Sequence, residues 1–168
     1  MWTHRRAMST LLGGLLCLAT VGGGEPAEKP GLFLLTPQEA KQLDLAEGQW
    51  RPIPRTRDIP RGPRVVVKRP QVLDTTDGPI IQTGSPTAFI VSFEENRAPV
   101  DMDSLEIRAR KGIFSKSLTD RLKPYLRGTA IEAEAVNVPE GRFLIQIEIA
   151  DKTGEKTVET YRLEVKGQ

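Results

Sequence analysis

The stretch from Thr87 to Phe93, Thr-Ala-Phe-Ile-Val-Ser-Phe, decides the fold that this sequence predicts. It is rich in β-branched and aromatic side chains, which favour β-strands. Two phenylalanines and a valine alternate on one face of such a strand, and Ala88, Ile90 and Ser92 fall on the other. Because both faces are largely apolar, we expect a central strand covered on both sides, with the other strands assembled around it.

Further strands follow in the second half of the chain. From Arg142 to Ala150 every second residue is phenylalanine or isoleucine, and a second alternating run extends from Lys156 to Val165. The residues between these runs, Asp151 to Gly154, have the turn chemistry of a β-hairpin. Ser104 to Arg110 also alternates, with polar side chains on its second face. These patterns predict an all-β antiparallel sandwich.

The first 23 residues have the composition of a secretory signal peptide. His4, Arg5 and Arg6 precede an apolar run from Leu11 to Val21, and small residues follow. We predict cleavage, export to the periplasm or the cell exterior, and no transmembrane segment in the mature chain. Retention of this segment as an anchor is the alternative, although the apolar run is short for a membrane span.

Cleavage would remove two residue types on which catalysis often depends. His4 is the only histidine and Cys17 the only cysteine, so the mature chain has no imidazole base, thiol nucleophile, disulfide or Cys/His metal site. Loss of Arg5 and Arg6 leaves 22 basic and 22 acidic residues, which makes nucleic acid a poor partner. No Gly-x-Ser-x-Gly motif is present. We therefore predict a protein that is not an enzyme and that needs no cofactor or metal.

A short helix and a basic arm are expected between the signal peptide and the sandwich. Thr36-Pro37-Gln38-Glu39 fits a helix start with a capping residue, proline in the first turn and a capping box. This helix should end near Gly48 and dock on the domain. From Arg51 to Pro70 the chain contains seven basic residues and five prolines, a composition that favours an extended segment. Within it, Arg64 to Lys68 is compatible with an edge strand.

Two interpretations of the arm remain open. In the first, its arginines Arg55, Arg57, Arg61 and Arg64 contact an anionic surface or an acidic partner. In the second, the segment is a solvated linker that its charge keeps extended. Trp50 at the head of the arm either anchors a partner or folds back on the sandwich, and we favour the second.

Turn motifs between residues 71 and 168 follow a shared pattern. They are Ser85-Pro86 before a buried strand, Pro99-Val100-Asp101 before the next, Val138-Pro139-Glu140-Gly141, and the Asp151–Gly154 hairpin before Leu163-Glu164-Val165. The pattern resembles bacterial Ig-like modules, the cadherin-like or fibronectin-like sandwiches of envelope and surface proteins. The cysteine pair and the sandwich tryptophan of antibody domains are missing. The resemblance implies an Ig-like fold and a role in adhesion, spacing or assembly.

We therefore divide the chain into a signal peptide (1–23), a tether with helix and basic arm (24–63) and an Ig-like β-sandwich (64–168). The predicted function is an exported, non-catalytic binding or structural module that contacts another envelope protein or an anionic envelope surface. The alternative is a module that recognises a glycan or calcium through its loops. Asp101 and Asp103 alone offer too few oxygens for calcium. A glycan platform needs exposed aromatic side chains, and most of those in the sandwich are expected in the core; they are Phe89, Phe93, Phe114, Tyr125, Phe143 and Tyr161.

Overall fold

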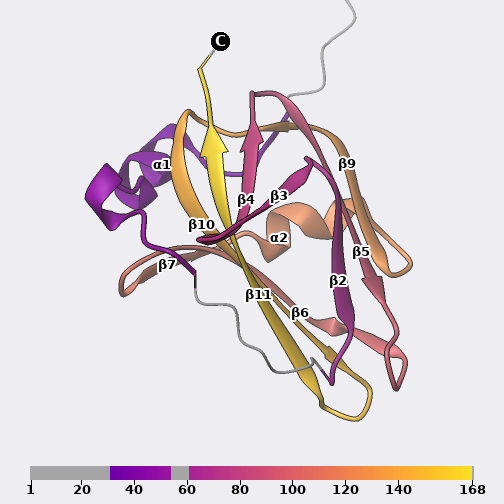
Figure 1. Cartoon of the computed structure of the whole chain (residues 1–168). Coiled ribbons are helices and arrows are strands. Elements are labelled where there is room, and N and C mark those ends of the chain that lie inside the picture. The colour runs from indigo at the N-terminus through magenta and orange to yellow at the C-terminus, as the bar shows by residue number, and fades with distance from the viewer. Residues whose placement is uncertain (1–30, 54–60, 168) are drawn as a thin grey trace, which may run out of the picture.

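Two β-sheets packed face to face make up most of the protein (Figure 1). The computed structural model describes residues 31–53 and 61–167. Sheet A has the strand order β1 (Leu32–Phe33), β9 (Ala130–Asn137), β5 (Thr87–Glu94) and β2 (Arg64–Arg69), with β8 (Leu126–Arg127) also paired to β9. Sheet B has the order β3 (Val72–Thr75), β4 (Gly78–Thr83), β11 (Lys156–Val165), β10 (Gly141–Asp151), β6 (Val100–Lys111) and β7 (Phe114–Ser117). The all-β sandwich predicted from the sequence is confirmed.

The connections between the strands are those of an Ig-like sandwich. The N-terminal strands are divided between the sheets, because β2 pairs antiparallel with β5 in sheet A and β4 pairs parallel with β11 in sheet B. The chain crosses from sheet A to sheet B between Arg69 and Val72, and β3 then forms a hairpin with β4. In sheet B, β10 lies between β6 and β11 and is antiparallel to both. This division of the first strands and the antiparallel second half define the Ig-like class.

β5 is the central strand of sheet A, as the sequence predicts, with β2 on one side and β9 on the other. Phe89, Val91 and Phe93 face the other sheet and are buried in the core. The opposite face, with Ile90 at its centre, is only half-buried. The expectation of a strand covered on both sides is therefore wrong: one face builds the core and the other forms part of the molecular surface.

The two C-terminal strands supply much of the opposing core face. The inward side chains of β10 are all buried and are Phe143, Ile145, Ile147 and Ile149. Those of β11 predicted to face inward, Tyr161, Leu163 and Val165, are buried as well. The carboxylate of Asp151 holds the connecting turn by accepting hydrogen bonds from the backbone N–H groups of Thr153 (2.9 Å) and Glu155 (3.1 Å). The predicted hairpin is confirmed in position, and its last paired residues are Ala150 and Lys156.

The helix α1 (Pro37–Leu43) begins at the predicted capping box. The Thr36 hydroxyl accepts a hydrogen bond from the backbone N–H of Glu39 (3.3 Å), and a Glu39 carboxylate oxygen accepts one from the backbone N–H of Thr36 (2.9 Å). The helix ends at Leu43, earlier than predicted. Gly48, where the helix was expected to end, lies in a separate 3₁₀ turn at Glu47–Gln49.

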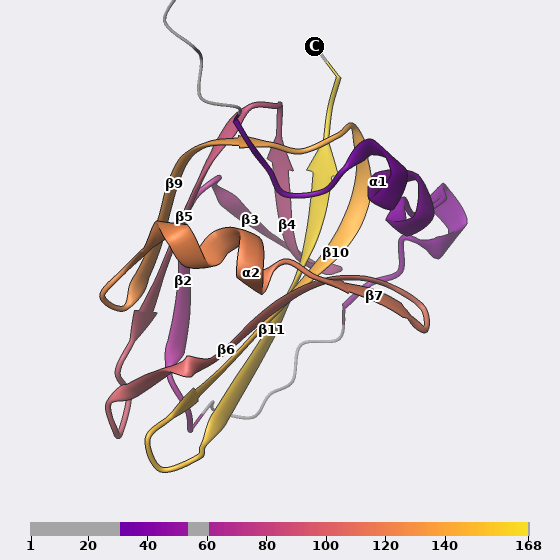
Figure 2. The same cartoon turned by 180° about the vertical axis from the view of Figure 1, so that it is seen from behind.

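α1 shares the hydrophobic core of the sandwich. Leu34, Leu35, Ala40 and Leu43 are buried in the same cluster as the inward residues of β5 and β10. A second helix, α2 (Thr119–Leu122), continues into the 3₁₀ turn Lys123–Tyr125 and links β7 to β8. Both helices lie on the flank of the sandwich that is turned to the viewer in Figure 2. The helix expected between the signal peptide and the sandwich thus closes one side of the sandwich.

The contribution of this segment to the core can be measured by one substitution. Leu35 is 0 % exposed, so Leu35→Ala should lower the free energy of unfolding by about 2–5 kcal/mol through lost burial and a residual cavity. Leu73→Ala, the same change at a side chain that is 41 % exposed, is the matched control and should cost much less. Urea unfolding of both variants gives the comparison, and equal losses would mean that α1 docks without building core.

Candidate functional site

Trp50 is the one predicted site residue whose side chain has a described aromatic contact. Its half-buried ring lies against the guanidinium of Arg162 on the outer face of β11, with 5.5 Å between the Arg162 Cζ atom and the ring centroid. Arg162 is only 5 % exposed, and its Nη2 atom donates a hydrogen bond to the Thr75 hydroxyl (2.9 Å). One ring face of Trp50 is therefore used within the molecule, as a cation–π partner.

The chain after Trp50 continues along sheet B, and the arm returns to the sandwich at its far end. The backbone N–H of Ile53 donates to the carbonyl oxygen of Asp77 (2.8 Å). Arg55 and Arg57 lie outside the described residues. The side chain of Arg61 is exposed, but a Cβ atom at Gly62 would come within 2.6 Å of the Glu155 carbonyl oxygen, and Pro63 is fully buried. The described end of the arm is thus packed against the β10–β11 hairpin.

Arg64 opens the edge strand β2 and belongs to the outer face of sheet A. Its guanidinium lies 3.7 Å from the Glu94 carboxylate on β5, and both side chains are well exposed. An exposed pair of this kind contributes little to stability. The structure therefore separates Trp50 from Arg64, because Trp50 lies on the outer face of sheet B and Arg64 on that of sheet A.

The outer face of sheet A has an apolar centre. The register places Val66 of β2 and Ala130 of β9 on either side of Ser92, and Ile90 one row further along β5. All four side chains are half-buried, with Ala88 beyond them. α1 contacts β6, β7 and β10, and α2 contacts β6. The 3₁₀ turn that follows α2 contacts β9, and its Tyr125 packs against the core cluster rather than on the Ile90 face. In Figures 1 and 2, α1 lies on the side of the molecule away from β2 and β5.

Charges of opposite sign border this apolar centre. On β2 the exposed residues Arg64, Lys68 and Arg69 are basic, and on β9 the exposed residues Glu132 and Glu134 are acidic. Arg127 on the short strand β8 lies beyond β9. The face is therefore electrically polarised across the sheet, positive along β2 and negative along β9.

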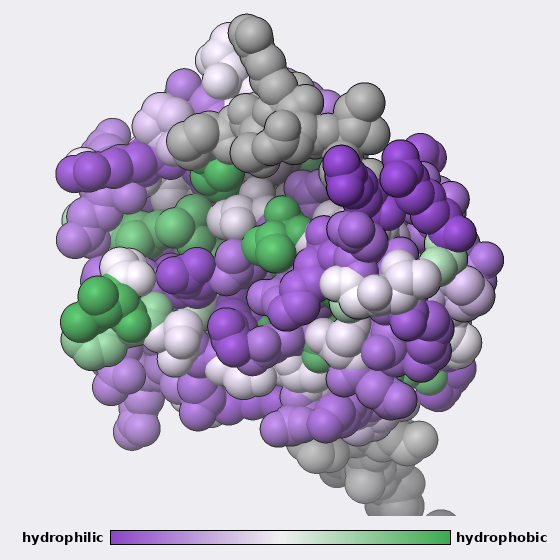
Figure 3. All heavy atoms as spheres, turned by 90° about the horizontal axis from the view of Figure 1, so that it is seen from below, coloured by the Kyte–Doolittle hydropathy of each residue, from purple (hydrophilic) through white to green (hydrophobic). Residues whose placement is uncertain are grey.

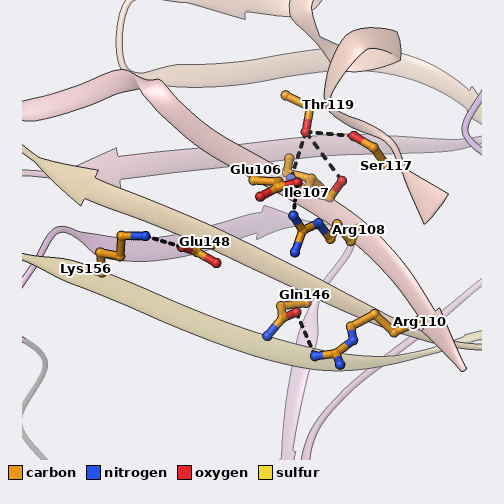
Figure 4. Close-up of polar contacts among 9 residues, drawn as sticks. All are labelled: Glu106, Ile107, Arg108, Arg110, Ser117, Thr119, Gln146, Glu148 and Lys156. Atoms are coloured by element: carbon orange, nitrogen blue, oxygen red, sulfur yellow. Dashed lines mark hydrogen bonds and ion pairs between the residues drawn. The ribbon is translucent and has the colours of Figure 1, made fainter. Parts of the chain in front are cut away.

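The outer face of sheet B differs because much of its charge is paired. Figure 4 shows Lys156 on β11 bound to Glu148 on β10 (2.8 Å) and Arg110 on β6 bound to the Gln146 amide oxygen (2.9 Å). Arg108 forms an ion pair with Glu106 on its own strand. Such a mutually satisfied polar surface is typical of a solvated sheet face.

A compact ionic cluster joins α1 to α2 and β7. The Glu39 carboxylate accepts hydrogen bonds from both terminal nitrogens of Arg121 (2.8 and 2.9 Å) and lies 3.0 Å from the Lys116 ammonium. The bidentate Arg121 guanidinium, together with the Thr36 N–H and Lys116, holds the pKa of Glu39 well below its ordinary value. Every member is satisfied, so the cluster is a structural clamp rather than a reactive site.

On β11, burial raises the pKa of two acidic groups, whereas the ionic cluster lowers the pKa of Glu39. Desolvation raises the pKa of Glu159 above its ordinary range. It also raises the pKa of Tyr161, with a further contribution from the negative charges of Glu159 and Asp74. These two groups share the inner face of β11, but no described nucleophile or cation stands with them. They form no catalytic constellation of the kind that an active site requires.

Within residues 31–53 and 61–167, no cluster of three or more potential ligands could hold a metal ion. Asp101, one of the aspartates considered for calcium, instead pairs with the Lys152 ammonium (2.5 Å). Most aromatic residues of the sandwich are buried as expected, namely Phe89, Phe93, Phe143 and Tyr161. Phe114, the first residue of β7, is 67 % exposed.

Comparison with known proteins gives fold-level similarity only. The chain matches no protein family and no curated protein. Among solved structures it is similar to CopC from Methylosinus trichosporium OB3b, with a TM-score of 0.38 and 13% identity over 63% of this chain and 95% of that one. It is also similar to murine CRIg, with a TM-score of 0.36 and 6% identity over 62% and 98% of the two chains. At these values neither match informs ligand or activity. The class, an Ig-like β-sandwich, follows from the strand order.

No described helix is long and apolar enough to cross a bilayer.

Removal of the Trp50 ring tests whether it stabilises the sandwich. Trp50→Ala should lower the free energy of unfolding by about 1–3 kcal/mol, because it removes buried ring surface and the cation–π contact with Arg162. Trp50→Phe keeps a ring over the guanidinium and should retain part of that stability. Thermal and urea unfolding report both values. If Trp50→Ala is as stable as the parent chain, the ring is available to a partner.

The Glu39 clamp makes stability depend on pH with a definite sign. Because the folded-state pKa of Glu39 lies below its ordinary value of 4.5, the ionised form stabilises the fold at neutral pH, and this contribution is lost as the pH falls towards the folded-state pKa. Glu39→Gln should therefore cost about 1.5–3 kcal/mol at pH 7.

The loss caused by Glu39→Gln should shrink steadily between about pH 5 and pH 2. Glu155→Gln, at an exposed carboxylate in the β10–β11 turn, serves as the control and should show no such trend. Urea unfolding across the pH series measures both. A loss for Glu39→Gln that is independent of pH would show that charge at this position is not the stabilising factor.

Proposed function

We propose that this protein is an exported, non-catalytic Ig-like module that acts by protein–protein contact, and that its contact face is the outer face of sheet A. One observation carries the proposal. The organising strand β5 has a second apolar face, centred on Ile90, that no described element covers. A contiguous apolar centre with a charged border is the usual composition of a protein interface.

The partner that fits this face best is a second copy of the chain. The border is basic along β2 and acidic along β9. A two-fold axis that runs along β5 would place β2 of each copy over β9 of the other, so that Lys68 and Arg69 approach Glu132 and Glu134 of the second copy. A two-fold contact of this type is self-complementary. A two-fold axis across the strands would instead bring like charges together.

Export of the chain supports this role but stays a prediction, because residues 1–30 lie outside the described part of the molecule. The proposed contacts of Arg55 and Arg57 with an anionic surface likewise stay a prediction. Arg64 belongs to the sheet A face, but its charge is paired with Glu94, so Lys68 and Arg69 supply the basic border that the proposal uses. No observation favours a glycan or calcium site over this face.

Self-association through sheet A can be broken and restored by charge. Sedimentation velocity over a concentration series should show the parent chain passing from monomer to dimer, more weakly as salt is raised. Lys68→Glu should abolish the dimer by placing two carboxylates together. Combining it with Glu132→Lys should restore the dimer, because the two charges swap places and attract each other again. Ile90→Glu should abolish it without rescue, since it buries an unpaired charge.

The matched control for Ile90→Glu is Leu73→Glu, which introduces the same charge at an exposed apolar residue of β3 in the other sheet. It should leave dimerisation unchanged, and circular dichroism should confirm that all variants fold. All variants begin at the same N-terminal residue, which mass spectrometry verifies. A parent chain that is monomeric at every concentration, or a dimer indifferent to Lys68→Glu and Ile90→Glu, would refute the proposed contact face.

A further inference from the structure

The turn between β6 and β7 exposes two adjacent hydrophobic side chains. Ile113 is 94 % exposed and Phe114 is 67 % exposed. Gly112 precedes them with a φ of +57°, which turns the chain tightly and directs the next residues outward. All four residues of β7 are exposed. In Figures 1 and 2 this hairpin projects from the sandwich on the side below α1.

This exposure sets the hairpin tip apart from the rest of the described surface. Five large hydrophobic residues are exposed within residues 31–53 and 61–167, and only Ile113 and Phe114 are neighbours in sequence. The view from below shows a hydrophobic protrusion at the left margin of the molecule, on the side where the hairpin projects in Figure 1 (Figure 3). Single exposed apolar residues are ordinary, but an adjacent pair at a projecting turn marks a site of interaction.

The stem of the hairpin is basic. Residues 108–116 include Arg108, Arg110, Lys111 and Lys116 and no acidic residue. Arg110 and Lys111 keep their charge unneutralised, since Arg110 bonds the Gln146 amide oxygen and Lys111 donates to the backbone carbonyl oxygen of Asp44 (2.6 Å). Lys116 shares the single carboxylate of Glu39 with Arg121, which leaves one positive charge over at that point. Among these four residues, and within the part of the chain that the structure describes, only Arg108 has a carboxylate of its own, Glu106.

We propose that the β6–β7 hairpin is a membrane-docking element that inserts Ile113 and Phe114 into the interface of an anionic phospholipid bilayer. The apolar tip enters the boundary between headgroups and acyl chains, and the basic stem meets the anionic headgroups behind it. The tip is convex and narrow, so a protein partner would have to supply a matching pocket, whereas a fluid bilayer accommodates such a wedge. An apolar tip on a basic stem matches both the acyl chains and the anionic headgroups of such a bilayer.

This element is independent of the face proposed for protein contact. The hairpin extends from the β6–β7 edge of sheet B, and the proposed contact face belongs to sheet A. Both surfaces can therefore be occupied at once, and a dimer formed through sheet A would carry two hairpins. The inference goes beyond the proposed function, because it assigns a second ligand, a lipid surface, to residues that the first does not use.

Co-sedimentation with vesicles measures the docking. The purified protein, with one N-terminus common to all variants, is mixed with vesicles of phosphatidylcholine alone or with phosphatidylglycerol added. The double variant Ile113→Ser/Phe114→Ser should bind the anionic vesicles at least about tenfold more weakly than the parent. Arg110→Gln/Lys111→Gln should weaken binding and flatten its dependence on salt. The control Leu73→Ser/Val158→Ser, at two exposed apolar residues elsewhere, should bind as the parent does.

A local readout distinguishes the hairpin from any other lipid contact of the chain. A Phe114→Trp variant should show a blue-shifted emission with anionic vesicles and quenching by brominated phosphatidylglycerol, and a Leu73→Trp variant should show neither. Absence of quenching at position 114, or quenching equal at both positions, overturns the proposal. Selective binding of the tip to an acidic protein instead of vesicles would overturn it as well. The Ile113/Phe114 double variant should still dimerise, so failure here and failure of the sheet A contact give different results.

Discussion

The rest of the structure depends on the contact between the inner face of β5 and the inner faces of β10 and β6. Phe93 on one sheet and Phe143, Ile107 and Ile147 on the other are at most 2 % exposed. The chain has a single cysteine, Cys17, so no disulfide staples the sheets as in antibody domains. Burial of apolar surface between the two sheets is therefore the main force that holds them together. Each strand's position follows from which of its faces enters this contact.

This constraint explains why the sequence predicts some elements well. The period-two alternation of β10 and β11 directly reports burial on one face, and Asp151 marks their turn, so both strands and their connection were predictable. The capping box at Thr36 likewise specifies the start of α1 from local chemistry alone. In these cases the residues that show the pattern in the sequence are also the residues that form the structure.

Other features depend on which distant segment covers a surface, and the sequence does not report this. Ile90 has the same apolar character whether it is buried under another layer or open, so the second face of β5 was predicted as core. Leu35 fills the core only because α1 folds back over β6 and β10. Most aromatic residues of the sandwich were expected in the core, and the sequence did not single out Phe114 as the one that the turn at Gly112 leaves exposed. The adjacent pair Ile113–Phe114 beside a turn glycine was the available signal.

The central claim is that the open face of β5 is a contact surface between copies of the chain. A dilution series followed by methyl NMR tests it directly, because the methyl groups of Ile90 and Val66 lie at the centre of the proposed contact and those of Leu73 lie in the other sheet. If the copies meet through this face, the Ile90 and Val66 signals shift with protein concentration while the Leu73 signals stay fixed. Signals that are all independent of concentration, or a shift confined to Leu73, would contradict it.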